Sequence, residues 1–535
     1  MYKRIYLSFF GLTIVFGLLI SNLGIIMFNT SNSPVSQSVN AKSQILDTSR
    51  GMIYDCNMKK IVNSNAKNIT VCLPSTEALN LVKEFVTQEE QREIYKKMNE
   101  GEINILSLPK KFNETSVKSV TVADRYSYNQ ICVHLIGHLD ENGDGATGLE
   151  KAYNNYLKRC DGNIKAVWSV DALGNILWGE GISFESDDYL SPAGIQLTID
   201  LEIQKIAENS LVNHNIDKGA VVVLNSDTNE ILAMASVPVF NPLNLSEAIN
   251  SNDSPFINRA LTPYSVGSVF KPFVACTAIE NNVNFTHNCT GSIDIGGTTF
   301  KCNNNNAHGI VNMTSAMEQS CNTYFIALGQ KIGDEKLISL CSDFGLGKQT
   351  ELADNFYAKA GKLPSFDTLT SPQSLANLSF GQGELLASPL QMAIAYSCFV
   401  NGGFYRPPTL MKAIIDEDRN AVQKVELPQN YRILNESTID EIDLILQKVV
   451  ENGNGNQAFS EITENHGKTA TAQSGWYENG TEVTHTWFCG YFTIDKFKYT
   501  AVIFKEDGGS GAVDCAPAFK EISEEIARIK HGRNE

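Results

Sequence analysis

The sequence of 535 residues lacks any surplus of positive charge. Lys and Arg number 43 against 60 Asp and Glu, and the net charge is -17. A protein that binds nucleic acid through its phosphates needs Lys and Arg to replace the counterions. The charge balance therefore excludes nucleic acid as an expected partner. The sequence also lacks any C-x-x-C pair, the common zinc pattern, although it has 12 cysteines. It predicts neither a metal nor a cofactor.

Long apolar runs are equally scarce. Only residues 5–28 are apolar and uncharged for long enough to span a bilayer, which takes about 20 residues. Lys3 and Arg4 precede this run, so the positive-inside preference predicts a cytoplasmic tail before it and an external chain after it. A cleaved signal peptide is the alternative, but its apolar core usually has about 7–15 residues and the one small-residue site, at 39–41, lies too far downstream. The sequence predicts a single-pass anchor in the cell membrane.

Composition divides the rest of the chain. A Ser- and Asn-rich stretch at 29–40 cannot bury a core and is typical of a linker. The next part mixes short extended runs with two helical stretches and is expected to form an elongated, dimerisation-like stalk domain. We therefore expect a cytoplasmic tail, an anchor, a linker, a stalk and a main domain at 1–4, 5–28, 29–40, 41–190 and 194–535.

The main domain is expected to be α/β, in the α+β sense. Residues 219–237 place two β runs around a polar turn, the pattern of an antiparallel hairpin. Residues 485–505 contain two more β runs, and 516–530 is an amphipathic closing helix. Strands at both ends with helices between them favour an antiparallel sheet that is assembled from distant parts of the chain and covered by helices.

Ser268 and Lys271, in YSVGSVFKPF, are three residues apart and would lie on one face of a helix, one turn from each other. A serine hydroxyl becomes a nucleophile when a neighbouring base takes its proton, and a desolvated lysine can do so. Pro272 is tolerated near a first turn, which places Ser268 at a helix N-terminus, where backbone N–H groups stabilise an oxyanion. Taken alone, S-x-x-K also arises by chance.

Two further motifs follow in order. Ser320 and Asn322 offer a hydroxyl and an amide on a turn, and Lys468, in HGKTAT, offers a cation on a candidate strand. With these residues the chain resembles the class B penicillin-binding proteins, monofunctional transpeptidases whose motifs are S-x-x-K, S-x-N and K-[ST]-G. Segments such as RGMIYD at 50–55 and LSFGQGELLASPLQMA at 378–393 extend the resemblance over nearly the whole chain.

The resemblance implies a peptidoglycan D,D-transpeptidase with an acyl-serine intermediate. Ser268 would attack the carbonyl between the two terminal D-alanines of a stem peptide, and Lys271 would take its proton. Ser320 would pass a proton toward the leaving amine, while Asn322 would hold Lys271 and the substrate amide. The amino group of a neighbouring stem peptide would then resolve the acyl-enzyme. Penicillin and other β-lactams would acylate the same serine.

For the third motif, the resemblance implies that Lys468 and Thr469 hold the terminal carboxylate of the peptide. The N–H groups of Ser268 and Thr471 would form the oxyanion hole. Ala470 stands where the family has glycine. Its methyl group is expected to narrow the gap between this strand and the nucleophile helix, and to alter the fit of substrate and β-lactams.

Two other functions are open to the same motifs. A membrane-bound β-lactam sensor would need several spanning helices and a cytoplasmic effector, and a non-catalytic cell-wall scaffold would not need intact motifs. The transpeptidase is therefore favoured. A polytopic glycosyltransferase is implied as its membrane partner, because the family commonly works with one and no such domain fits in residues 1–190.

Most cysteines lie in apolar settings, where a free thiol behaves as a small core residue. Cys289 and Cys302 bracket a polar loop, and the sequence leaves open whether they form a disulfide or stay reduced. Residues 140–151 nearly match a calcium loop but lack the bidentate acid at the last position. His134 and His138 are four residues apart without an H-E-x-x-H context, so a structural role is favoured over zinc.

Overall fold

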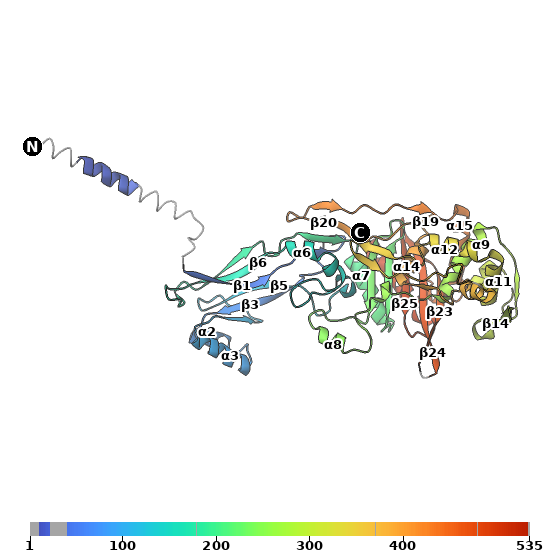
Figure 1. Cartoon of the computed structure of the whole chain (residues 1–535), viewed down its shortest axis with the longest axis horizontal. Helices are drawn as coiled ribbons and strands as arrows, with labels where there is room; N and C mark the ends of the chain where they lie inside the picture. The colour runs from blue at the N-terminus through green and yellow to red at the C-terminus, as the bar shows by residue number, and fades with distance from the viewer. Residues whose placement is uncertain (1–9, 22–39, 178, 370, 479, 533–535) are drawn as a thin grey trace, which may run out of the picture. The chain divides into compact units, whose positions relative to one another are not determined.

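The computed structural model describes residues 10–21, 40–177, 179–369, 371–478 and 480–532 (Figure 1). Contacts between Cα atoms divide the chain into two compact units. Unit 1 comprises Met1–Thr48, Ala66–Val122 and Gly162–Tyr189, and unit 2 comprises Ser49–Asn65, Ala123–Asp161 and Leu190–Glu535.

This division differs from the predicted contiguous stalk at 41–190. Two segments of that range belong to unit 2, and in the first of them strand β2 (Met52–Tyr54) pairs in parallel with β8 (Gly194–Leu197). A pairing over so long a separation leaves no mark on local composition. The predicted domain boundary therefore depended on local amino-acid composition alone.

Residues 10–21 form a helix inside the predicted anchor. The other parts of that anchor, 5–9 and 22–28, lie outside the described residues, as do the predicted tail at 1–4 and the linker residues 29–39. Among the residues described, no helix is long and apolar enough to cross a membrane.

Besides the helix at 10–21, the described part of unit 1 contains two three-stranded sheets, of strand order β1-β6-β7 and β4-β3-β5, and the helices α2 and α3. Their bounds are β1 Ala41–Thr48, β3 Asn65–Cys72, α2 Thr76–Val82, α3 Gln88–Asn99, β4 Asn104–Ser107, β5 Val117–Asp124, β6 Asn163–Ser169 and β7 Ile182–Asp187. Helix α3 begins with a capping box between Thr87 and Glu90, which supports a helix in this highly charged stretch.

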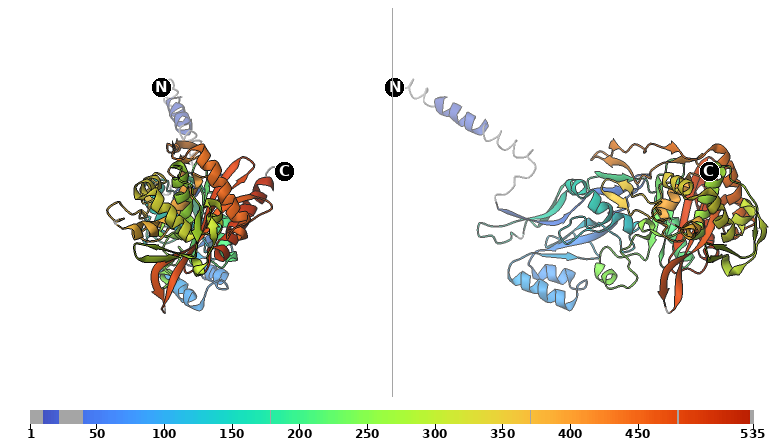
Figure 2. Two further views of the ribbon diagram at one scale, coloured as in Figure 1. Left: turned by 90° about the vertical axis from the view of Figure 1, so that its right-hand side faces the viewer. Right: turned by 45° about the vertical axis from the view of Figure 1, so that its right-hand side comes forward.

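Unit 2 is built around a five-stranded antiparallel sheet of order β10-β9-β25-β24-β23. Its strands are β9 Gly219–Asn225, β10 Ile231–Val237, β23 Glu464–Glu478, β24 Thr481–Ile494 and β25 Phe497–Lys505. The sheet joins strands from both ends of the domain, as the sequence predicts. Strand β23 forms one edge, and its hairpin with β24 projects beyond the helices in both views of Figure 2.

Both faces of this sheet are covered by helices. Val221 and Val223 of β9 join the core that includes α7 (Leu201–Asn213) and α17 (Ala516–Gly532). The alternate residues of β9 join the opposite core, which includes α9 (Lys271–Glu280). Successive side chains of a strand point to opposite faces. Burial on both faces therefore explains why β9 reads as the continuous apolar run AVVVL.

The remaining elements of unit 2 surround this sheet. The helices are α4 Val133–Ile136, α5 Gly148–Ala152, α6 Asn154–Arg159, α8 Leu245–Ile249, η1 Arg259–Leu261, η2 Gly267–Phe270, η3 Asn303–Asn305, α10 Met313–Glu318, α11 Asn322–Ile332, α12 Asp334–Asp343, α13 Pro372–Ser379, α14 Pro389–Ser397, α15 Glu436–Glu451, η4 Asn456–Ala458 and α16 Gly511–Asp514. The short strands are β11 Tyr264–Ser265, β12 His287–Cys289, β13 Ser292–Ile295, β14 Thr298–Lys301, β15 Gly309–Val311, β16 Thr350–Ala353, β17 Phe356–Ala358, β18 Leu386–Ala387, β19 Phe404–Tyr405, β20 Met411–Ile415, β21 Ala421–Lys424 and β22 Tyr431–Arg432.

Candidate active site

Ser268 lies in the 3-10 turn η2, immediately before helix α9, whose first turn contains Pro272. Gly267 has a φ of +61°, and a Cβ placed on it would lie 3.0 Å from the Cβ of Ala472 in β23. Glycine is the residue that tolerates both this backbone angle and this close approach. The local sequence thus brings the serine against the edge strand of the sheet.

Two hydrogen bonds hold this turn, and sequence reasoning did not single out the residues that supply them. The Gly267 N–H donates to the carbonyl oxygen of Gly381 at 2.9 Å. The Tyr396 hydroxyl donates to the carbonyl of Val269 at 2.7 Å, and both residues are fully buried. In the sequence, the only signal for Gly381 and Tyr396 is that they fall in or beside the segment at 378–393.

Lys271 is completely buried and forms a hub of hydrogen bonds. Its Nζ donates to Oδ1 of Asn322 at 2.7 Å, and to Oγ and the carbonyl oxygen of Ser320 at 3.0 and 2.8 Å. Burial lowers the pKa of Lys271 to about 7. A large fraction of this amine is therefore unprotonated near neutral pH, as a general base requires.

Ser320 connects this lysine to the nucleophile. Its Oγ donates a hydrogen bond to Oγ of Ser268 at 3.1 Å. The residue has a φ of +53° at the turn before α11, and Asn322 in the same turn donates from Nδ2 to the carbonyl of Lys301 at 3.0 Å. The first two motifs thus meet as predicted, and the hydrogen-bonded path from Lys271 to Ser268 runs through the Ser320 hydroxyl.

Lys468 of β23 is also fully buried, and its Nζ lies 3.0 Å from the carbonyl oxygen of Thr469. Burial, together with the charge of Lys271, holds the pKa of Lys468 well below its usual value. The charge of Lys271 thus raises the cost of protonating Lys468. An anion that enters the site relieves this cost, so the arrangement favours a ligand with a carboxylate.

The other predicted residues of β23 have different surroundings. Oγ1 of Thr469 lies 3.4 Å from Oδ1 of Asn454, and Oγ1 of Thr471 accepts a hydrogen bond from the N–H of Gly511 at 3.4 Å. The side chain of Ala470 is buried, and a Cβ on Gly267 would lie 3.4 Å from its methyl group. The Ala470 methyl group therefore faces the nucleophile turn, and its effect on the fit of a substrate stays a prediction.

The disulfide that the sequence left open is not formed. Cys289 and Cys302 are free, with Sγ atoms 3.7 Å apart, whereas a disulfide bond has a length of about 2.05 Å. Cys302 lies on the far side of the short hairpin β13–β14, and its sulfur also approaches Cys321 at 3.9 Å. Because the sulfur of Cys302 has two sulfur neighbours, the three thiols form a cluster and not an isolated pair of cysteines.

The histidine pair and the calcium-like loop at 140–151 make hydrogen bonds within the fold. His134 Nε2 lies 2.7 Å from the carbonyl of Pro255, and His138 Nδ1 lies 3.0 Å from Oγ1 of Thr147. In the calcium-like loop, Asp140 accepts two backbone N–H groups of its own turn, and Asp144 pairs with Lys158 at 2.8 Å. These hydrogen bonds agree with a structural role for both groups of residues.

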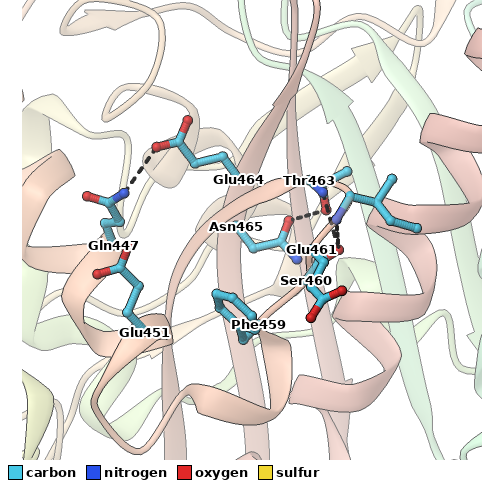
Figure 3. A pocket seen from close by; sticks show the side chains of 9 residues that line it. Gln447, Glu451, Phe459, Ser460, Glu461, Thr463, Glu464 and Asn465 are labelled. Atoms are coloured by element: carbon cyan, nitrogen blue, oxygen red, sulfur yellow. Dashed lines mark hydrogen bonds between the residues drawn. The ribbon is translucent and has the colours of Figure 1, made fainter.

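A separate pocket of about 280 Å³ lies at the start of β23 (Figure 3). Three of the side chains around it are carboxylates, from Glu451, Glu461 and Glu464. Glu464 accepts a hydrogen bond from Gln447 across the opening, as the dashed line in Figure 3 marks. These negative charges disfavour the anionic end of a peptide, so the candidate active site remains at Ser268 and the two buried lysines.

The comparisons with known proteins agree with this geometry. A family model described as "Penicillin binding protein transpeptidase domain" matches residues 219–524. Stage V sporulation protein D of Bacillus subtilis is 29% identical over 506 residues, with 88% of this chain and 76% of that protein covered. The peptidoglycan D,D-transpeptidase FtsI of Buchnera aphidicola is 28% identical over 409 residues, with 74% and 68% covered.

A solved structure shares the fold. Penicillin binding protein 3 of Mycobacterium tuberculosis, in complex with aztreonam, has a TM-score of 0.65 and 24% identity, with 92% of this chain and 97% of that chain covered. The family match spans more than half of the chain and contains all three motifs. The chain therefore belongs to the penicillin-binding protein transpeptidase family, as a class B member.

Proposed function

We propose that this chain is a peptidoglycan D,D-transpeptidase that cross-links stem peptides through an acyl-serine intermediate and is inhibited by β-lactams. The observation that carries the proposal is the hydrogen-bonded path from the buried Lys271 through Ser320 to Ser268. This path gives the serine a base with a pKa near neutrality. The names of the relatives, peptidoglycan D,D-transpeptidases among them, support the same reaction.

In the acylation step, Oγ of Ser268 attacks the carbonyl carbon of the penultimate D-alanine. When Lys271 is neutral, the Ser320 hydroxyl turns its proton toward the Lys271 amine and accepts from Ser268, which reverses both hydrogen bonds of the path. The proton of Ser268 then passes to Ser320, and that of Ser320 passes to the amine of Lys271. A C–O bond forms, the C–N bond to the last D-alanine breaks, and the proton returns along the path to the leaving amine. The amino group of a second stem peptide then attacks the ester, forming the cross-link and restoring Ser268.

The edge strand β23 supplies the binding groups. Lys468 and Thr469 hold the terminal carboxylate, since a cation and a hydroxyl together match an anionic chain end. The N–H groups of Ser268 and Thr471 stabilise the oxyanion, and Ala470 sets the spacing between them by its packing against Gly267. Oδ1 of Asn322 accepts from the Lys271 amine, and one N–H of Nδ2 donates to the carbonyl of Lys301, so that the other N–H of Nδ2 would donate to the substrate amide.

The same proposal extends to location and partner. Residues 5–28 would anchor the chain in the cell membrane, and Lys3 and Arg4 would keep the tail inside, so that catalysis takes place on the outer face. Residues 41–190 would contribute the stalk and 194–535 the catalytic domain. A polytopic glycosyltransferase would supply glycan strands in the same membrane, because the family resemblance associates such proteins with a polymerase.

Covalent labelling with fluorescent penicillin tests the reaction. The purified full chain should be labelled at one serine, and Ser268→Ala should abolish the label. Ser342→Ala, on the surface helix α12, is the matched control and should be labelled like the native chain. Full labelling of Ser268→Ala would refute the assignment of the nucleophile.

A further inference from the structure

Three sulfurs and one imidazole meet beside the S-x-N turn. We define the cysteine–histidine cluster as Cys289, Cys302, His308 and Cys321. Its four potential ligand atoms all lie within 4.8 Å of one another. Along the chain the residues follow the pattern C-x12-C-x5-H-x12-C, which contains no closely spaced pair of the usual zinc type.

The distances within the cluster match the edges of a metal-binding tetrahedron. The Sγ atom of Cys302 lies 3.7 Å from that of Cys289 and 3.9 Å from that of Cys321. Nδ1 of His308 lies 3.3 Å from Sγ of Cys289. Sulfur ligands at the zinc–sulfur distance of about 2.3 Å stand about 3.8 Å apart in a tetrahedron. The side chains therefore already have the spacing of a zinc site.

The segment that carries three of the ligands buries few of its own side chains. Of residues 289–309, only Cys289, Gly291 and Cys302 are buried, and the hairpin β13–β14 and the polar turn η3 are mostly exposed. Asn304 and Asn305 both have positive φ values and reverse the chain so that His308 returns to the two cysteines. A segment too small for an apolar core of its own is commonly stabilised by a metal or a disulfide.

The fourth ligand belongs to the catalytic motif. Cys321 lies between Ser320 and Asn322, and Asn322 donates to the carbonyl of Lys301, the residue before Cys302. Thr323, the next residue of α11, places its hydroxyl 3.4 Å from Sγ of Cys321. A link between the two cysteines through one ion would therefore tie the exposed segment to the turn that positions the proton path.

We propose that the cysteine–histidine cluster binds one zinc ion through three thiolates and Nδ1 of His308. The ion keeps the Ser320–Asn322 turn in its catalytic position, so that Cys321 is a positioning residue. Soft thiolates with one imidazole in a tetrahedron are the ligand set that selects zinc. The Thr323 hydroxyl lies 3.4 Å from Sγ of Cys321 and would donate to that sulfur as a thiolate, as is common around metal sites. His308 is partly exposed and gives the ion a route of entry.

Metal analysis of the full chain, purified under reducing conditions, tests the zinc site directly. After removal of loosely bound metal with a weak chelator, we expect one zinc per chain. Cobalt(II) put in place of zinc should show the strong visible absorption of tetrahedral thiolate coordination. His308→Ala and Cys289→Ser should each lower zinc affinity by about tenfold or more. His308→Ala is the milder change, because its side chain lies at the edge of the cluster.

Two control variants separate this inference from the proposed function. Cys341→Ser replaces a buried cysteine of α12 outside the cluster and should keep the zinc. Ser268→Ala should also keep it while losing the penicillin label, so a wrong nucleophile and a wrong metal site give different results. Zinc removal should slow acylation of the native chain, and added zinc should restore the rate. Zinc content below one-tenth of an equivalent in the native chain, or unchanged affinity in His308→Ala, would overturn the proposal, as would a disulfide found between Cys289 and Cys302.

Discussion

The hydroxyl of Ser320 donates a hydrogen bond to the hydroxyl of Ser268, with 3.1 Å between the two oxygens. Because the same Ser320 oxygen accepts from Lys271, the middle member of the path both receives and passes a proton. The nucleophile of this chain therefore depends on a residue 52 positions away in the sequence for its connection to the base.

We expect Ser320→Ala to lower the second-order rate constant of acylation by benzylpenicillin by about 10²–10⁴-fold, the usual contribution of a positioned acid or base. The fold should persist, since alanine fills the same turn with one atom less. Stopped-flow measurement of acylation and a thermal unfolding curve would check both statements. Ser342→Ala is the control, and a loss below threefold in Ser320→Ala would show that Lys271 reaches Ser268 without Ser320.

The acylation rate should rise with pH through about 7. Burial lowers the pKa of Lys271 to about 7, and only the unprotonated amine accepts the serine proton. Each pH unit below this pKa reduces the free amine about tenfold, and above it the rate should level off. The rate constant for a β-lactam without groups that titrate in this range should be measured from about pH 5.5 to 8.5. A rate that is constant over this range, or that falls as pH rises, would contradict the role of Lys271.

The sequence predicted the central sheet well because its pattern is local. The hairpin at 219–237 and the β runs at 485–505 are continuous apolar segments with clear turns, and both formed strands of the predicted sheet. The division at 41–190 and 194–535 stays a prediction, and the two compact units divide the chain differently for the opposite reason. The pairing of β2 with β8 joins residues more than a hundred positions apart, and no local composition records it.

The residues of the active site could be predicted from the sequence, but the hydrogen bonds that connect them could not. The spacing of Ser268 and Lys271 predicted their shared face, and the family motifs supplied Ser320 and Lys468. The proton path was not predictable, because it depends on the positive φ of Ser320 and on how far Lys271 is buried. The cysteine–histidine cluster was missed because its members come from separate loops that only the folded chain brings together.

Gly267→Ala should destabilise the protein and slow acylation. The backbone of the new alanine would have to keep a φ of +61°, and its methyl group would lie 3.0 Å from the Cβ of Ala472. The turn η2 must therefore move away from β23. We expect a loss of about 1–3 kcal/mol in the free energy of unfolding, from the strained backbone and the contact together. Gly297→Ala is the matched control, because Gly297 has a φ of +83° and a Cβ placed on it would meet nothing within 4 Å.

Comparison of the two glycine variants separates backbone strain from the contact. Urea unfolding gives the stability of each, and penicillin labelling gives the acylation rate. Gly267→Ala should lose at least tenfold in acylation, because a 1 Å shift of a reacting group can cost about 10²-fold. Gly297→Ala should lose stability only. An equal effect of the two variants on acylation would mean that the close approach of Gly267 to β23 does not position Ser268.

Removal of the Glu150 carboxylate from its ion network should strongly destabilise unit 2. Glu150 has no solvent exposure, its two oxygens lie 2.7 Å from Nε of Arg50 and Nε of Arg125, and the Tyr126 hydroxyl donates to it at 3.1 Å. Glu150→Ala leaves two guanidinium groups in the interior without their shared carboxylate. Breaking a buried pair by removing one partner costs about 3–5 kcal/mol, so we expect a loss of this size in the free energy of unfolding.

An exposed ion pair of the same unit provides the control for Glu150→Ala. Lys59 and Glu202 lie 2.7 Å apart at the surface, and loss of such a pair costs about 0–1 kcal/mol because water and salt screen both charges. Urea unfolding should therefore show a large loss of stability for Glu150→Ala and almost none for Lys59→Ala. Similar small losses in both variants would show that the two arginines find other partners or water once the carboxylate is gone.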